Sequence, residues 1–195
     1  MYGTVKENGT RQYKYVYVEI PKKNGKSELA AALGLYHTFA DGAYDGEVYV
    51  CAADRENASI VFNAALSMLR QSRVLSNPKR TRIIESQRTI IDIKTNTKFK
   101  VLSSEGYSKH GYKPTCVIFD ELHAQPDRRL YDVMTYGAGD ARKQPVWIVL
   151  TTAGDDPDRT SIGWEVHTQA RSVIEWRKGN QDGNFNLPRW YPVIY

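Results

Sequence analysis

The stretch Tyr15-Val-Tyr-Val-Glu-Ile-Pro-Lys-Lys-Asn-Gly-Lys-Ser27 decides the fold of this 195-residue chain. It begins with β-branched and aromatic residues, which predict a strand over Tyr15–Ile20. A helical pattern follows from Lys26 to about Phe39, with apolar residues on one face. A turn that contains lysine and glycine and joins a strand to a helix indicates a phosphate-binding loop.

The turn carries the groups that such a loop, a P-loop, needs. Its backbone N–H groups surround phosphate oxygens at a helix N-terminus, a lysine reaches the β- and γ-phosphates, and a hydroxyl binds magnesium. Gly25, Lys26 and Ser27 supply the glycine, the lysine and the hydroxyl. We therefore expect ATP and Mg2+ as cofactors, bound by the residues Pro21, Lys22, Lys23, Asn24, Gly25, Lys26 and Ser27.

One position departs from the common P-loop pattern, because Ile20 stands where most P-loops have their first glycine. A Gly-Lys-Ser tripeptide also occurs often by chance, so a lysine-rich surface turn is the alternative interpretation. The apolar strand before the turn and the helix after it favour the P-loop.

A second strand ends in two acids. Val117-Ile-Phe precedes Asp120 and Glu121 directly, a pattern typical of the Walker B motif. Asp120 is expected to hold the magnesium ion together with Ser27, and Glu121 to orient and polarise the attacking water. A helix-capping acidic pair is the alternative. Two motifs in this order, each at a strand end, favour nucleotide hydrolysis with Glu121 and Lys26 as its catalytic residues.

Hydroxyl groups follow a third buried strand, in Leu150-Thr151-Thr152-Ala-Gly154. Carboxyl ends of parallel strands meet at one edge of a sheet, where ligands bind. Thr151 and Thr152 are therefore expected to sense the γ-phosphate and couple its loss to movement, although a turn rich in small residues would have the same composition.

The wider pattern predicts an α/β fold. Near-continuous apolar strands over Glu47–Ala52, Thr115–Asp120 and Val146–Thr151 alternate with helical segments, which is typical of a mainly parallel sheet covered on both faces. Three short apolar runs between Thr81 and Leu102 predict a β-meander inserted in this pattern. We expect residues 1–195 to form one ATPase domain.

Composition excludes several other classes. No apolar run is long enough for a membrane span, and no signal peptide is visible, so we expect no membrane partner and a cytoplasmic protein. Cys51 and Cys116 lie in apolar runs and are expected to be buried thiols, and the four histidines are scattered.

The net charge of +5 is compatible with a polyanionic partner such as nucleic acid. One candidate surface for salt-sensitive contact with the DNA backbone is the basic meander, although a solvated sheet face is the alternative. Its cations are Lys79, Arg80, Arg82, Lys94, Lys98 and Lys100.

Four segments together resemble a known family, the large terminase subunit of tailed bacteriophages. These segments are Tyr17–Ala31, Val48–Ala58, Phe119–Ala124 and Leu150–Gly154, and they occur in the family's order and spacing. A P-loop without its first glycine is normal in that family, so Ile20 supports the match. The resemblance covers nearly the whole chain and implies a P-loop NTPase fold of the ASCE/RecA-like type.

The resemblance also implies function. It places Lys22 on the basic P-loop position, which adds Lys22 to the catalytic residues. It places Asp120 and Glu121 on the metal-binding and catalytic acids, and Thr151 and Thr152 on the coupling motif. It implies a motor that pumps double-stranded viral DNA into a procapsid from the host cytoplasm. Its implied partners are the small terminase subunit, the portal of the procapsid and further copies of the chain in a homo-oligomeric ring.

Large terminases carry a C-terminal nuclease domain, and we expect residues from about 160 to 195 to begin the link to it. We therefore expect no nuclease activity from these residues. The family's adenine-contacting segment is not recognised before Tyr15. A basic residue acting in trans could be Lys109, Arg128, Arg129 or Arg142.

Two other functions stay open at this stage. Asp120-Glu-Leu-His123 also spells the DExH box of a helicase ATPase core. A non-catalytic nucleotide-binding or DNA-binding scaffold is the other alternative, and the presence of Lys26, Asp120 and Glu121 together argues against it.

Overall fold

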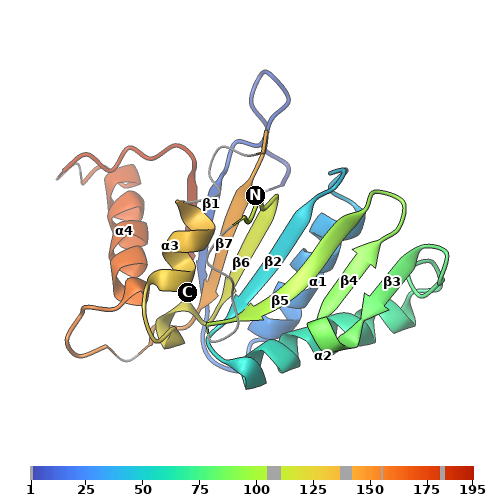
Figure 1. Cartoon of the computed structure of the whole chain (residues 1–195). Helices are drawn as coiled ribbons and strands as arrows, with labels where there is room; N and C mark the ends of the chain where they lie inside the picture. Colours follow the sequence, from blue (N-terminus) through green and yellow to red (C-terminus); the bar gives the residue numbers. More distant parts are fainter. Residues whose placement is uncertain (1, 105–110, 137–141, 155, 181–182) are drawn as a thin grey trace.

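The computed structural model describes residues 2–104, 111–136, 142–154, 156–180 and 183–195 (Figure 1). Its described part contains one sheet with the strand order β3-β4-β5-β2-β6-β7-β1-β8. The strands are β1 (Tyr15–Glu19), β2 (Glu47–Ala52), β3 (Thr81–Ile84), β4 (Thr89–Asp92), β5 (Thr97–Ser103), β6 (Cys116–Asp120), β7 (Val146–Thr151) and β8 (Trp190–Ile194). The helices are α1 (Lys26–Phe39), α2 (Arg55–Gln71), α3 (Arg129–Thr135) and α4 (Ile162–Arg177), with 3-10 helices η1 (Glu85–Gln87) and η2 (Leu122–Ala124).

The sheet is mainly parallel, as the sequence predicts. Strands β5, β2, β6, β7, β1 and β8 all run in the same direction, and the antiparallel pairs are β3–β4 and β4–β5. The predicted meander is therefore the edge of this sheet. Its third strand, β5, pairs with β4 on one side and with the central strand β2 on the other.

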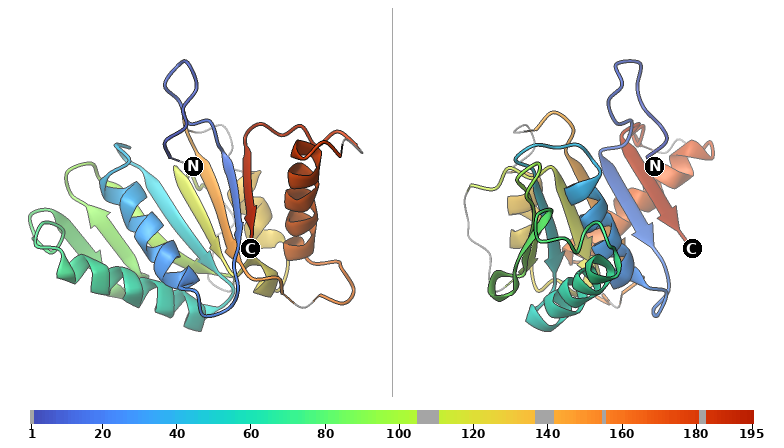
Figure 2. Two further views of the ribbon diagram at one scale, coloured as in Figure 1. Left: turned by 180° about the vertical axis from the view of Figure 1, so that it is seen from behind. Right: turned by 90° about the vertical axis from the view of Figure 1, so that its right-hand side faces the viewer.

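Helices cover both faces of the central strands. On β6, Ile118 belongs to the cluster beneath α1 and α2, whereas Val117 and Phe119 belong to the cluster beneath α3 and α4. The two views in Figure 2 show the helices on opposite sides of the sheet. Every residue of β6 and β7 is buried, which explains why these strands read as continuous apolar runs.

Strand β8 is the one strand that the sequence did not predict. It contains Pro192, and a proline within a short apolar run argues against a central strand because it lacks an N–H donor. The structure accommodates it at the edge, where β8 pairs with β1 and Pro192 lies opposite Tyr17.

The strand order gathers the carboxyl ends that the site needs. β6, β7 and β1 are consecutive neighbours, with Asp120 opposite Leu150 and Glu19 opposite Thr151. Beyond the strands, the N–H of Ile20 still donates to the carbonyl of Thr151 at 3.0 Å. The loop after β1, the acids after β6 and the threonines after β7 therefore lie along one edge.

Helix α1 approaches the sheet closely at Gly34. A Cβ atom at this position would lie 2.2 Å from Cε2 of Phe99, a fully buried residue of β5. The packing distance thus requires glycine at this position, and α1 lies in close contact with β5 of the sheet.

This contact makes a stability prediction. Gly34→Ala should destabilise the chain by about 1–3 kcal/mol, because overpacking a core outweighs the gain of up to about 1 kcal/mol in helix propensity. Denaturant unfolding would measure the change. In a Phe99→Leu background the same substitution should cost at least about 0.5 kcal/mol less. A Gly34→Ala protein more stable than the wild type would contradict the packing argument.

Candidate active site

The loop between β1 and α1 folds back on itself. Lys23 and Gly25 adopt left-handed backbone conformations, with φ of 66° and 69°. The side-chain amide of Asn24 donates to the carbonyls of Pro21, at 3.2 Å, and Lys22, at 3.3 Å. Because Gly25 is the N-cap and has no side chain with which to cap the helix, the first N–H groups of α1 are open to an anion.

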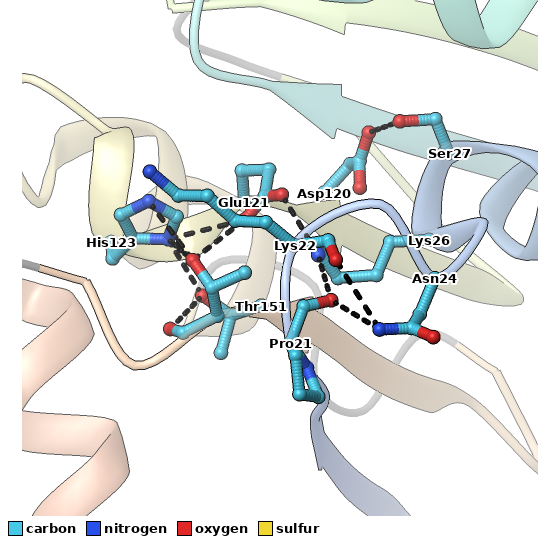
Figure 3. A network of polar contacts seen from close by, with 10 residues as sticks. Pro21, Lys22, Asn24, Lys26, Ser27, Asp120, Glu121, His123 and Thr151 are labelled. Atoms are coloured by element: carbon cyan, nitrogen blue, oxygen red, sulfur yellow. Dashed lines mark hydrogen bonds and ion pairs between the residues drawn. The ribbon is translucent and has the colours of Figure 1, made fainter.

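Lys26 is the buried cation of the site. It is 5% exposed, and its Nζ donates to the carbonyl of Pro21 at 3.2 Å. The same Nζ lies 3.3 Å from Oε1 of Glu121 (Figure 3). The ammonium group is therefore held between the loop and the acidic strand.

Ser27 and Asp120 form the second link between these elements. The Ser27 hydroxyl donates to Oδ2 of Asp120 at 3.0 Å, while Oδ1 of Asp120 is buried without a partner in the described residues. Burial raises the pKa of Asp120 to about 6, and the charge of Glu121 adds to this effect, whereas the Ser27 hydrogen bond and Lys26 oppose it. A free carboxylate oxygen beside a hydroxyl matches the all-oxygen ligands that Mg2+ prefers.

Glu121 lies where β6 ends and η2 begins. Its φ of 54° is in the left-handed region, which is uncommon for a residue with a side chain and is often found at functional sites. Its carboxylate is placed between two partners, because Oε1 faces Lys26 and Oε2 lies 3.2 Å from Nδ1 of His123. The side chain is 26% exposed, so it is open to solvent at the edge of the sheet.

His123 joins this acid to the threonines after β7. Its Nδ1 lies 2.9 Å from Oγ1 of Thr151, and Oγ1 of Thr152 lies 3.5 Å from Oε2 of Glu121. The Thr151 hydroxyl donates to the carbonyl of Thr152, so it accepts from an Nδ1–H of His123. Burial lowers the pKa of His123, as do Lys22 and Lys26, while Glu121 opposes them, and the imidazole is therefore neutral at neutral pH.

Two glycines pack closely against His123. A Cβ atom on Gly154 would lie 2.8 Å from Cβ of His123, and one on Gly163 of α4 would lie 2.7 Å from its Cα. Both glycines permit contacts that any other residue would prevent. The position of His123 is thus fixed by the end of the threonine motif and by the start of α4.

Most predicted site residues come together at this edge. Lys26, Glu121, Thr151 and Thr152 are joined by polar contacts that run through His123, and the Ser27–Asp120 pair lies beside them. Figure 3 shows the Lys22 side chain extending toward His123. Sequence reasoning missed His123 as a member of the site, although the DExH spelling had already drawn attention to its place three residues after Asp120.

The candidates for a residue acting in trans are engaged within the chain where they are described. Arg128 pairs with Asp132 and Glu165, and Arg129 pairs with Asp127. Arg142 donates to the carbonyl of Lys113. Lys109 lies outside the described residues.

The remaining sequence expectations concern metals, thiols and membranes. The described residues contain no group of three or more histidine, cysteine, aspartate or glutamate side chains that could hold a metal ion, and Cys51 and Cys116 are both buried free thiols. Within the described ranges, no helix is long and apolar enough to cross a membrane.

Sequence comparison decides the family. The family described as terminase large subunit, ATPase domain, matches residues 1–167, a range that holds every site residue described above. This chain belongs to that family. The terminase large subunit of Enterobacteria phage HK97 is 36% identical over 152 residues, which cover 74% of this chain and 29% of that protein. The chain thus spans less than a third of this relative. Family membership decides against the helicase alternative.

Solved structures agree with this assignment. The crystal structure of the HK97 bacteriophage large terminase superposes with a TM-score of 0.76 at 25% identity, covering 97% of this chain and 36% of that one. The large terminase ATPase domain of Thermus phage P74-26 shares the fold, with a TM-score of 0.56 at 14% identity over 91% of this chain and 87% of that one. The predicted P-loop NTPase fold of this terminase ATPase domain is confirmed.

The raised pKa of Asp120 predicts a pH-dependent stability. The pKa of Asp120 is about 6 in the folded chain and near 3.8 in the unfolded chain. The protonated group therefore favours the folded state at low pH, and this contribution to stability is lost as the pH rises through about 6. Asp120→Asn removes this titration. Between about pH 5 and about pH 7.5, the free energy of unfolding of the variant should rise by about 1–2 kcal/mol relative to that of the wild type. Denaturant unfolding in the presence of a chelator measures both. A constant difference between the two proteins across this range would contradict the assignment.

Proposed function

We propose that this terminase ATPase domain hydrolyses Mg·ATP and that hydrolysis drives double-stranded viral DNA into a procapsid. The observation that carries the proposal is the 3.3 Å pair of Lys26 Nζ and Glu121 Oε1, beside the Ser27–Asp120 link. A phosphate-binding cation, a metal-binding pair and a candidate base lie at one helix N-terminus, and hydrolysis of a bound nucleotide needs all three.

The loop and α1 bind the phosphates in this proposal. The N–H groups from Lys23 to Ser27 face the phosphate oxygens, and Lys26 offsets the charge on the β- and γ-phosphates. Lys22, on the exposed loop, adds a second cation. Ser27 and Asp120 hold Mg2+, which when bound would neutralise phosphate charge.

Glu121 acts on the attacking water. Its carboxylate faces Lys26 and His123, and phosphate oxygens that take up the charge of Lys26 leave Oε1 free to accept a hydrogen bond from water. His123 orients the carboxylate by its contact with Oε2. The Nδ1–H of His123 is shared with Thr151, so a change at the γ-phosphate reaches the threonines through one imidazole.

The larger assembly is part of the proposal. We infer that the chain acts within a longer large subunit, in a homo-oligomeric ring, with the small terminase subunit and the portal of the procapsid as partners in the host cytoplasm. Residues 1–195 form the ATPase domain of that subunit, and DNA cleavage belongs to a nuclease domain outside these residues.

Lys26→Ala should remove ATP hydrolysis while the chain stays folded. Loss of one preorganised charge at a reacting centre lowers kcat by about 10²–10³-fold. Phosphate release measures the rate, and circular dichroism checks the fold. Lys23→Ala is the matched control. Lys23 contributes only its backbone N–H to the proposed phosphate site and its side chain is exposed, so this variant should keep its rate within about threefold. Equal losses in the two variants would rule out the special role of Lys26.

Glu121→Gln should separate binding from turnover. Glutamine keeps the shape of the side chain but cannot accept a proton, so kcat should fall by about 10²–10⁴-fold while Mg·ATP affinity stays within a few-fold. Binding of a fluorescent ATP analogue and phosphate release provide the two measurements.

Two further variants make this comparison specific. Asp120→Asn should weaken magnesium-dependent nucleotide binding, in contrast to Glu121→Gln. His123→Ala should lower kcat less than Glu121→Gln does and leave KM nearly unchanged, because it acts only through the carboxylate. A wild-type chain that binds Mg·ATP and releases no phosphate would favour a non-catalytic scaffold.

A further inference from the structure

A basic cleft of about 380 Å³ opens at the end of the sheet opposite the nucleotide site. None of the described residues that line it is acidic, whereas the whole chain has 27 basic and 22 acidic residues. Such local separation of charge indicates an anionic ligand. The cations of this basic cleft are Lys6, Arg11, Lys14, Arg142, Lys143 and Arg189.

The cleft is built at the amino ends of three neighbouring strands, β7, β1 and β8. Lys14 precedes β1, Arg189 precedes β8, and Arg142 and Lys143 precede β7. Backbone bonds tie these segments together, since the N–H of Lys14 donates to the carbonyl of Arg189 at 2.9 Å and that of Trp147 to the carbonyl of Lys14 at 2.8 Å. Figure 2 shows the N-terminal loop at this end of the sheet, far from the loop that follows β1.

Two of these cations are held in place without an acidic partner. The Arg142 guanidinium donates to the carbonyl of Lys113, and the Lys14 ammonium lies 4.9 Å from the ring centre of Trp147. Arg11 is the exception, because it pairs with Asp41. In the described part of the chain, Lys6, Lys143 and Arg189 form no ion pair.

We propose that the basic cleft binds the phosphate backbone of double-stranded DNA. The guanidinium group of Arg142, held by a backbone carbonyl, matches phosphate oxygens, and the amide and hydroxyl groups of Asn8, Thr10 and Gln144 are typical donors to sugar and phosphate. An interface for an acidic protein would be expected to centre on buried apolar or aromatic anchors, whereas this lining is mainly polar. The proposal rests on the proposed function for the identity of the polyanion.

The position of the basic cleft gives it a direct connection to the nucleotide. Strand β1 has Lys14 at one end and Pro21 just beyond the other, and its five residues span about 17 Å. One strand thus joins the proposed DNA contact to the phosphate-binding loop.

The sequence suggested a different DNA surface, the basic meander, and the structure allows a direct comparison. Arg82 and Lys98 lie on the same face, each opposite Ile91 of β4, and both are exposed. Arg80 is engaged by the buried Asp92 at 3.3 Å. A matched pair of cations is therefore available on each surface.

The test compares two charge-reversed double variants of the whole chain. Lys143→Glu/Arg189→Glu alters the basic cleft at exposed positions, and Arg82→Glu/Lys98→Glu makes the same change in net charge on the meander. Fluorescence anisotropy with a labelled mixed-sequence duplex, over a salt series, measures affinity. The cleft variant should bind at least about tenfold more weakly and lower the slope of log affinity against log salt by about 1.8, the value for two lost phosphate contacts. The meander variant should stay within about threefold of the wild type.

Three outcomes would overturn the proposal. The first is a loss of duplex affinity in the meander variant that equals or exceeds the loss in the cleft variant. The second is displacement of the labelled duplex by polyglutamate as effectively as by unlabelled duplex. The third is no duplex binding by the wild-type chain at low salt. ATP turnover without DNA should be the same in the cleft variant as in the wild type. This measurement separates the two proposals. If the proposed ATPase function is wrong, neither the wild type nor the cleft variant should hydrolyse ATP, whereas an error in the DNA site leaves turnover intact in both proteins.

Discussion

The buried ammonium group of Lys26 is the constraint on which the site depends. An amine that is 5% exposed must be matched by acceptors and negative charge, because an unpaired buried cation is very costly. Its two partners come from distant parts of the chain, the carbonyl of Pro21 and the carboxylate of Glu121. They can meet only if β1 and β6 end at the same edge, one strand apart, which is what the order β6-β7-β1 provides. Thr151 and Thr152 then lie between them because β7 is the intervening strand.

Much of this arrangement could be predicted from the sequence, since the features concerned are local. Tyr15–Glu19 and Cys116–Asp120 are short apolar strands, and the groups that follow them directly carry the proposed chemistry. Asp54 caps α2 by accepting from the N–H of Asn57 at 2.8 Å, a contact between residues three apart. The structure places Lys26, Ser27, Asp120 and Glu121 at one edge of the sheet, and their proposed roles follow from that geometry.

The features that escaped prediction depend on tertiary structure. The importance of His123 comes from Thr151, Gly154 and Gly163, which only the fold brings near it. Strand β8 was not predicted because it contains Pro192, and the sheet accommodates this proline only because β8 is an edge strand. The basic cleft combines the chain's beginning with segments before β7 and β8, so no single stretch of sequence reveals it. Patterns within one element are readable, whereas convergence of separate segments is not.

The glycine at position 163 has a mechanical consequence. With no side chain there, the first turn of α4 rests against the backbone of His123 with no free clearance. A displacement of η2 toward α4 would therefore press backbone against backbone, and no side-chain rotation at this position could relieve it. Helix α4 packs in turn on β8, the outermost strand beside β1. The residue that contacts Glu121 thus lies at one end of a series of packing contacts that reaches the far border of the sheet.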